Sequence, residues 1–175
     1  MNIQIPSARV PLIDPKTGLI STEWFNYLFL LSGPNSKGTP TPDGGYAVKL
    51  INKTGAASVK GYLVDASPTT DRAVRLVPVN DPDCIGAFLE SGVPDGSEAW
   101  IVVSGLAYVY FFGSTTRGHY ARIGVTADTG EAAGQAISEA IPTSPFATDK
   151  HFQEIGHVLE SRTGAGLALC CLHFN

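Results

Sequence analysis

Short apolar segments alternate with turn-forming residues along most of the chain after residue 45. Each segment is rich in β-branched or aromatic residues, and Gly, Pro, Asp, Asn or Ser separates it from the next. This pattern is typical of strands and predicts a mainly β domain, folded as a compact β-barrel or sandwich. The predicted strands cover residues 46–51, 59–64, 73–77, 84–89, 99–103, 106–112, 119–125, 154–159 and 166–174.

The segment 130–141 fits this pattern poorly. It contains Ala and Glu, which favour helices, but Gly134 and Pro142 disfavour a long one. We therefore predict a loop there, with at most one turn of helix.

The first 32 residues follow a different pattern. Pro6, Pro11 and Pro15 indicate an extended arm, and the strongly apolar segment 21–31 then predicts one short helix. Burying about six large apolar side chains is worth on the order of 10 kcal/mol, so this helix needs a surface to cover it. The predicted partner-binding residues of the arm and helix are Pro11, Ile13, Trp24, Phe25, Tyr27, Leu28 and Leu31.

Three kinds of surface could cover this helix: the chain's own domain, further copies of the chain, or another protein. A membrane span is not expected, because the apolar run has only about half of the roughly 20 residues that a span requires. A signal peptide is not expected either, since no basic segment precedes the run.

A Gly- and Pro-rich tether separates the helix from the predicted barrel. We therefore expect an anchor at residues 1–32, a linker at 33–45 and a β-barrel domain at 46–175. Such an order of anchor, linker and displayed domain favours a structural or binding role over catalysis.

A motif recurs within the predicted barrel. Residues 85–91 (IGAFLES) correspond to residues 155–161 (IGHVLES), and the upstream segments 60–62 (KGY) and 117–120 (RGHY) also match. We predict two related β-units, about 60–103 and 117–174, which pack together because neither could bury an apolar face alone. The Gly of each motif is expected to permit a bulge or a close approach of backbones.

The repeated Glu90 and Glu160 have two explanations. They could be the paired carboxylates of a small glycan hydrolase, which needs the two groups about 5 to 9.5 Å apart. The favoured explanation is a structural turn that the chain uses twice.

Composition narrows the function further. Charged residues make up 16% of the chain and the net charge is −4, with Lys and Arg scattered singly, so no basic patch for nucleic acid is expected. Cys84, Cys170 and Cys171 are an odd number without metal-ligand spacing, and we interpret them as reduced, mostly buried thiols of a chain made in a cytoplasm.

No phosphate-binding loop, nucleophile elbow or metalloprotease motif occurs, so we predict no enzyme, and no catalytic, cofactor or metal residue. His157 and His173 could converge on adjacent strands and hold a metal at a symmetry axis, although ordinary barrel or surface histidines are the simpler explanation. The aromatic run 108–112 could form a sugar-binding platform, or divide between the core and an interface. The acidic loops at 81–83 and 95–96 could attract calcium, but turn chemistry explains them better.

The repeated pattern of a Gly-opened strand, an Ile-Gly-x-x-Leu-Glu motif, a Gly turn and an apolar strand resembles the small β-barrel decoration proteins of tailed-bacteriophage capsids. The segment 11–25 (PLIDPKTGLISTEWF) is similar to the N-terminal segments of many phage structural proteins, including head-fibre and tail-associated ones. Simple decoration proteins often lack such an arm and helix, so the resemblance favours a head fibre with an N-terminal anchor.

This resemblance implies a non-enzymatic virion protein, made in the host cytoplasm, that binds the capsid surface through its arm and displays the barrel. The implied partners are the major capsid protein or other virion proteins, together with further copies of the chain, a trimer being favoured. It leaves open a tail-associated adaptor or receptor-binding protein, and a host surface glycan as a ligand. Neither nucleic acid nor membrane insertion is implied.

Overall fold

In the computed structural model, the described residues are 6–7, 10–22, 24, 38–125, 128, 130, 132–141 and 153–173. The chain divides into two compact units, Met1–Thr39 and Pro40–Asn175. No helix long and apolar enough to cross a membrane occurs within the described ranges.

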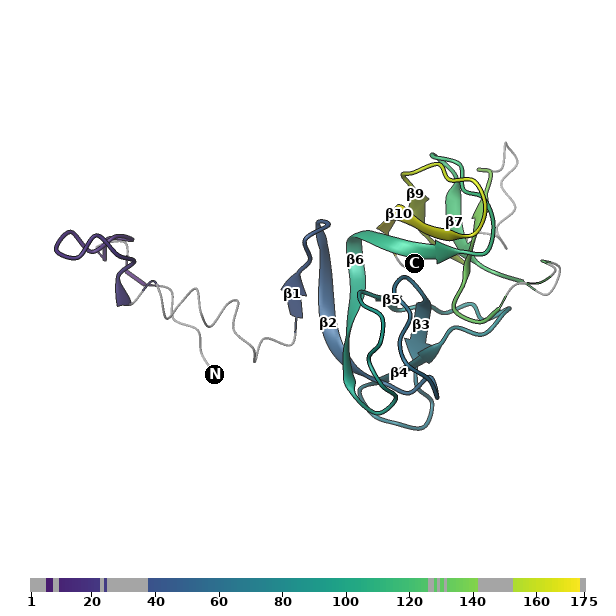
Figure 1. Cartoon of the computed structure of the whole chain (residues 1–175), viewed down its shortest axis with the longest axis horizontal. Coiled ribbons are helices and arrows are strands. Elements are labelled where there is room, and N and C mark those ends of the chain that lie inside the picture. The colour runs from purple at the N-terminus through teal and green to yellow at the C-terminus, as the bar shows by residue number, and fades with distance from the viewer. Residues whose placement is uncertain are drawn as a thin grey trace. The chain divides into compact units, whose positions relative to one another are not determined.

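The fold is mainly β, as the hydrophobic pattern predicts. All strands belong to one ten-stranded sheet with the order β1-β2-β4-β3-β5-β6-β10-β9-β7-β8 (Figure 1). The strands are β1 (Gly38–Pro40), β2 (Gly45–Asn52), β3 (Leu63–Ala66), β4 (Ala73–Leu76), β5 (Gly86–Phe88), β6 (Glu98–Phe111), β7 (Tyr120–Ile123), β8 (Ala136–Glu139), β9 (Glu154–Val158) and β10 (Gly166–Leu172).

The sheet closes twice, because two further pairings, β2–β6 and β6–β8, join strands that are distant in the sheet order. The first closure gives a five-stranded barrel of β2, β4, β3, β5 and the N-terminal half of β6. The second gives a barrel of the C-terminal half of β6 with β10, β9, β7 and β8. The long strand β6 therefore runs through both barrels and is the element they share (Figure 1).

The two barrels repeat one scheme of pairing. β2 pairs in parallel with β4 and antiparallel with β6, just as the second half of β6 pairs in parallel with β8 and antiparallel with β10. The antiparallel pairs β3–β4, β3–β5 and β5–β6 correspond to β7–β8, β7–β9 and β9–β10. The internal duplication predicted from the sequence is confirmed, and each unit begins one strand earlier than the motif alone suggested.

Gly105 marks the passage of β6 from one barrel to the other. It is the register partner of Gly45 at the start of β2 and of Leu172 at the end of β10. Its φ is +76°, and a Cβ there would lie 2.9 Å from the carbonyl oxygen of Gly44. A residue without a side chain is needed where the ends of β2 and β10 meet on β6.

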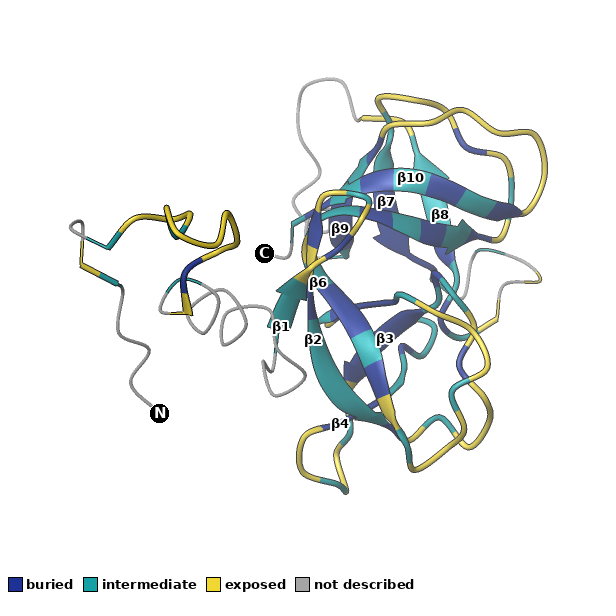
Figure 2. Cartoon of the chain, turned by 60° about the vertical axis from the view of Figure 1, so that its left-hand side comes forward, coloured by how far each residue is buried: buried dark blue, intermediate teal, exposed yellow. Residues whose placement is uncertain are grey.

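The interiors of the barrels form the apolar core. One cluster of fully buried residues fills the first barrel: Val64, Val74, Phe88, Ala99 and Ile101. The larger cluster combines the interior of the second barrel with residues of the first: Ala47, Leu63, Val77, Ala87 and Val102. Because strand residues alternate between faces, the first barrel buries its inner face in itself and part of its outer face against the second. Buried positions accordingly follow the strands of both barrels, whereas exposed positions gather in the loops (Figure 2).

The glycine of each copy of the repeated motif lies close to a neighbouring backbone. A Cβ on Gly86 would lie 2.5 Å from the carbonyl oxygen of Val102, and one on Gly156 would lie 2.1 Å from that of Cys171. Both approaches are far below an ordinary van der Waals contact, so the predicted close approach of backbones is confirmed in each barrel.

The structure differs from the secondary structure predicted for three segments. Residues 136–139, predicted as loop, form β8, because β7 and the end of β6 supply hydrogen-bonding partners for them. Residues 38–40, assigned to the linker, form β1 beside β2, and the tether segment 41–44 is the turn between them. The predicted break between 99–103 and 106–112 is absent, since β6 continues through it.

Candidate partner-binding surface

The N-terminal unit contains a small hairpin at residues 12–21. The Asp14 N–H donates to the Leu19 carbonyl at 2.8 Å, the Ser21 N–H donates to the Leu12 carbonyl at 3.0 Å, and Ile13 and Ile20 form a β-bridge. The Asp14 side chain accepts the Lys16 N–H at 2.8 Å, and Gly18 supplies a positive φ of +71°. Asp, Pro, Gly and this hydrogen bond are the local chemistry that turns a chain back on itself. The arm predicted to be extended is therefore folded into a hairpin here.

The hairpin is fixed to the segment that follows it. The Ser21 hydroxyl donates to the Pro11 carbonyl at 2.8 Å, and the Trp24 indole N–H donates to the Val10 carbonyl at 2.9 Å. Trp24 is half-buried, and its one strong donor is already engaged within the unit. Trp24 thus contributes to the structure of the arm.

Large aliphatic side chains line the hairpin and remain in solvent. The exposed fractions are 52% for Leu12, 48% for Ile13, 70% for Leu19 and 46% for Ile20. Single exposed apolar residues need no explanation, but four within nine residues of sequence make a concentrated apolar surface. We call these four residues the aliphatic hairpin surface.

The predicted partner-binding residues divide into two groups. Pro11 and Ile13 are exposed beside or within the aliphatic hairpin surface, and Trp24 is half-buried next to it. Thr22 and Trp24 are helical, but Phe25, Tyr27, Leu28 and Leu31, with most of the predicted helix, lie outside the described residues. Sequence reasoning missed Leu12, Leu19 and Ile20, because it treated the arm as extended and looked for apolar residues only in the helix.

The repeated glutamates occupy equivalent turns. The Ser58 hydroxyl donates to the Glu90 carbonyl at 2.9 Å, and the Thr115 hydroxyl donates to the Glu160 carbonyl at 2.7 Å. In both cases the backbone of the glutamate makes this contact. Both glutamates are exposed residues, and the Glu160 carboxylate also accepts the Leu169 N–H at 3.2 Å.

The serine that follows each glutamate completes the same turn. The Ser91 hydroxyl accepts the Lys60 N–H at 2.8 Å, and the Ser161 hydroxyl accepts the Arg117 N–H at 3.0 Å. In each unit the motif, which follows β5 or β9, is therefore hydrogen-bonded to the loop after the unit's first strand, β2–β3 in the first unit and β6–β7 in the second. This shared turn accounts for the repetition that had suggested a carboxylate pair.

The aromatic run 108–112 divides between interior and surface. Phe111 is fully buried, and Phe112 is 37% exposed. Tyr110 packs edge-on against Tyr62 with ring centroids 5.1 Å apart, and Tyr108 lies under the Lys60 ammonium. The run consists of the C-terminal end of β6 and the residue after it, and it divides between core and surface. The subunit interface of the second sequence interpretation stays a prediction.

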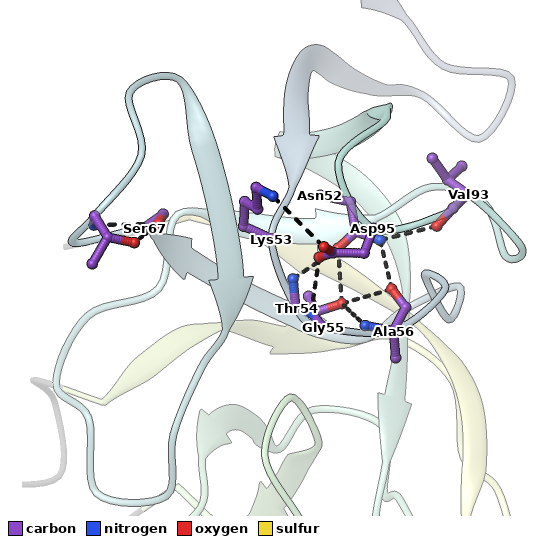
Figure 3. A network of polar contacts seen from close by, with 9 residues as sticks. Asn52, Lys53, Thr54, Gly55, Ala56, Ser67, Val93 and Asp95 are labelled. Carbon is purple, nitrogen blue, oxygen red and sulfur yellow. Dashed lines mark hydrogen bonds and ion pairs between the residues drawn. The ribbon is translucent and has the colours of Figure 1, made fainter.

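The acidic loops are built as turns. Asp81 accepts the Asp83 N–H at 3.1 Å and pairs with Arg75 at 3.0 Å. Asp95 accepts the Gly55 N–H at 2.9 Å and lies 3.7 Å from the Lys53 ammonium (Figure 3). The Asp81 and Asp95 carboxylates thus have both backbone and cationic partners, which supports the turn explanation for the two loops.

The three cysteines are free thiols. Cys84 and Cys170 are buried and Cys171 is half-buried, as expected for neighbours that point to opposite faces of a strand. Burial raises the pKa of Cys84 and of Cys170 to about 12. Neither buried thiol is suited to act as a nucleophile near neutral pH, because the thiolate is the reactive form.

Comparisons with known proteins show a similarity in fold. No family model matches the chain, and no curated protein matches it. Among solved structures it is similar to the N base of the head fiber gp8.5 in bacteriophage phi29, with 11% sequence identity and a TM-score of 0.45. The match covers 73% of this chain and 92% of that chain. A similarity of this size does not assign a function.

Proposed function

We propose that this chain is a non-enzymatic structural protein of a tailed-bacteriophage particle, of the capsid-decoration or head-fibre type. Its N-terminal unit attaches to the capsid surface, and its double barrel is the displayed body. The attachment partner is the major capsid protein or another virion protein.

The aliphatic hairpin surface is the observation that carries this proposal. It lies on a compact unit separate from the barrels, and it exposes four large aliphatic side chains. The same segment has the sequence that resembles phage structural proteins. A short apolar hairpin suits a shallow groove between capsid subunits, because docking there would remove its exposed aliphatic surface from water.

The barrels support a structural role in a different way. Their repeated polar motif is used in turns, and their apolar side chains form continuous cores. A trimeric state and a host-glycan ligand remain predictions of the resemblance.

Immunogold electron microscopy of particles from the source tests the location. Antibody raised against residues 46–175 should label the head at regular positions. Label confined to the tail would replace the proposal by a tail-associated adaptor or receptor-binding protein. Absence of the chain from purified particles, checked by mass spectrometry, would refute a virion role.

A binding experiment tests the attachment surface. Full-length protein is mixed with particles that lack it, and the bound fraction is measured by co-sedimentation. The double variant Leu12→Ser/Leu19→Ser should bind about 10- to 100-fold more weakly, since each truncation removes about 1 kcal/mol or more of apolar burial. The matched control Val59→Ser/Leu159→Ser removes two aliphatic side chains that are each 40% exposed on the barrels, and it should bind normally. Equal binding by both variants would refute attachment through the hairpin.

A further inference from the structure

Two histidines and a glutamate meet at one edge of the second barrel. Glu154 and His157 belong to β9, and His173 directly follows the last residue of β10. One potential ligand atom from each residue lies within 4.8 Å of the other two. The histidine convergence considered from the sequence therefore occurs within one chain, with a glutamate that the sequence did not single out.

An irregularity in β9 brings the glutamate to the histidines. Residues three apart on a regular strand point to opposite faces, which would separate Glu154 from His157. Along β7, however, Ala121 pairs with Gly156 and Arg122 pairs with Glu154, so Ile155 is an extra residue on β9. This β-bulge returns Glu154 to the face of His157.

The neighbouring strand supplies the third group. Cys171 of β10 is the register partner of His157, and His173 follows Cys171 by two residues. His173 is held at this edge by its N–H, which donates to the Ile155 carbonyl at 3.1 Å. The His157 and His173 rings lie with centroids 5.0 Å apart, and the Tyr120 ring packs 5.3 Å from that of His157.

The separations suit a shared cation. Glu154 Oε1 lies 3.4 Å from His173 Nε2 and 3.6 Å from His157 Nε2. Both distances are longer than the usual N–H···O distance of about 2.9 Å. Two ligands at about 2.05 Å from a tetrahedral zinc ion are about 3.4 Å apart, which is close to both values.

Burial completes the arrangement. The side chain of Glu154 is 1% exposed, whereas those of His157 and His173 are 43% and 42% exposed. A carboxyl group thus lies at the base of the cluster, and two imidazoles lie at its open side. A cation can therefore enter from solvent. With three protein ligands, a tetrahedral ion keeps its fourth coordination position for water.

We propose that Glu154, His157 and His173 bind one divalent transition-metal ion, with zinc as the representative. Imidazole nitrogens favour zinc and its neighbours in the first transition row over magnesium or calcium, which prefer oxygen ligands. The bound ion joins β9 to the C-terminal end of β10, and its role is to fasten the last strand of the second barrel.

Isothermal titration of the untagged full-length protein with zinc chloride, after removal of metals by a chelator, tests the site. We expect one zinc ion per chain. His157→Ala and His173→Ala should each weaken binding by at least about tenfold. His119→Ala is the matched control, because His119 lies outside the cluster with its ring nitrogen 3.2 Å from the Ser138 hydroxyl, and it should bind like the wild type. Absence of zinc binding, or unchanged affinity in both cluster variants, would overturn the proposal.

Two further measurements test whether a lost zinc affinity comes from misfolding, and whether Cys171 is the metal ligand. Far-ultraviolet circular dichroism of the metal-free variants should match that of the wild type, since both imidazoles are partly exposed and their truncation empties no core. Cobalt(II) should give the visible bands of a four- or five-coordinate ion without a thiolate charge-transfer band, and Cys171→Ser should leave zinc affinity unchanged. A thiolate band, or loss of binding in Cys171→Ser, would show that the cysteine holds the metal and would overturn the three-ligand assignment.

Discussion

The Asn52 side chain offers a stringent test of how the first barrel is held together. It is fully buried at the end of β2, and it contacts two loops (Figure 3). Its amide nitrogen donates to the carbonyls of Ala56 and Val93, each at 2.9 Å. Its amide oxygen accepts the backbone N–H and the hydroxyl of Thr54, at 3.1 and 2.8 Å. The equivalent strand position in the second barrel, by the shared register, is the buried Phe111.

Replacing Asn52 by Ala removes these four hydrogen bonds. At about 1 kcal/mol each, their summed contribution is about 4 kcal/mol. Some compensation remains, because the single Thr54 hydroxyl proton can turn to the Ala56 carbonyl, 2.9 Å away, and the Val93 carbonyl keeps the Ser58 N–H. We therefore expect Asn52→Ala to lower the free energy of unfolding by about 2 to 3 kcal/mol.

The isosteric variant Asn52→Asp separates hydrogen bonding from packing. It keeps the shape and the two accepting contacts, but it points a carboxylate oxygen at the Ala56 and Val93 carbonyls. Because a buried, unpaired charge is costly, Asn52→Asp should be at least as destabilising as Asn52→Ala near neutral pH. A merely steric role for Asn52 would predict the opposite order.

Urea unfolding followed by tryptophan fluorescence measures both variants. Lys53→Ala is the matched control on the next residue, since its pair with Asp95 is 3.7 Å long and its side chain is 41% exposed. We expect that control to change stability by less than about 1 kcal/mol, as is usual for surface ion pairs. If Asn52→Ala destabilised the protein no more than Lys53→Ala, the network would not hold the two loops.

Three further predictions concern the repeated glycine and the cysteines. Gly86→Ala and Gly156→Ala should each lower the free energy of unfolding in urea by about 2 kcal/mol or more, because a Cβ at either position would strike a backbone carbonyl. Gly113→Ala is the control and should be nearly neutral, since a Cβ there meets nothing within 4 Å. Equal effects of all three substitutions would refute the close-approach argument. In native protein near pH 8, a thiol reagent should modify only the half-buried Cys171, and all three cysteines should react in denaturant; rapid native modification of Cys84 would show that its burial is wrong. Burial raises the pKa of Cys84 in the folded protein from 9.0 to about 12. The contribution of the buried thiol to stability is therefore fully present below pH 9 and declines between pH 9 and 12. Across that interval Cys84→Ala should lose less stability than the wild type.

Several features of this protein follow from the sequence alone. The alternation of apolar and polar residues predicts most of the strands, because a half-buried strand needs that period wherever it lies in the fold. The two copies of the Ile-Gly motif predict the duplication, because a glycine that must admit a neighbouring backbone is needed at the same place in each unit. The segment 12–21 contains its own turn chemistry in Asp14, Pro15 and Gly18, although the sequence analysis took it as extended.

Other features depend on the tertiary structure. Residues 136–139 become a strand only because β7 and β6 offer them partners, and β6 stays continuous through Gly105 because β2 and β10 both pair with it there. Glu154 joins the two histidines only through a bulge whose position is set by the register with β7. Local sequence determines which residues favour strands and turns, but register and closure depend on partners far away in the chain. The barrels, and the cluster that they bring together, are therefore decided by long-range pairing.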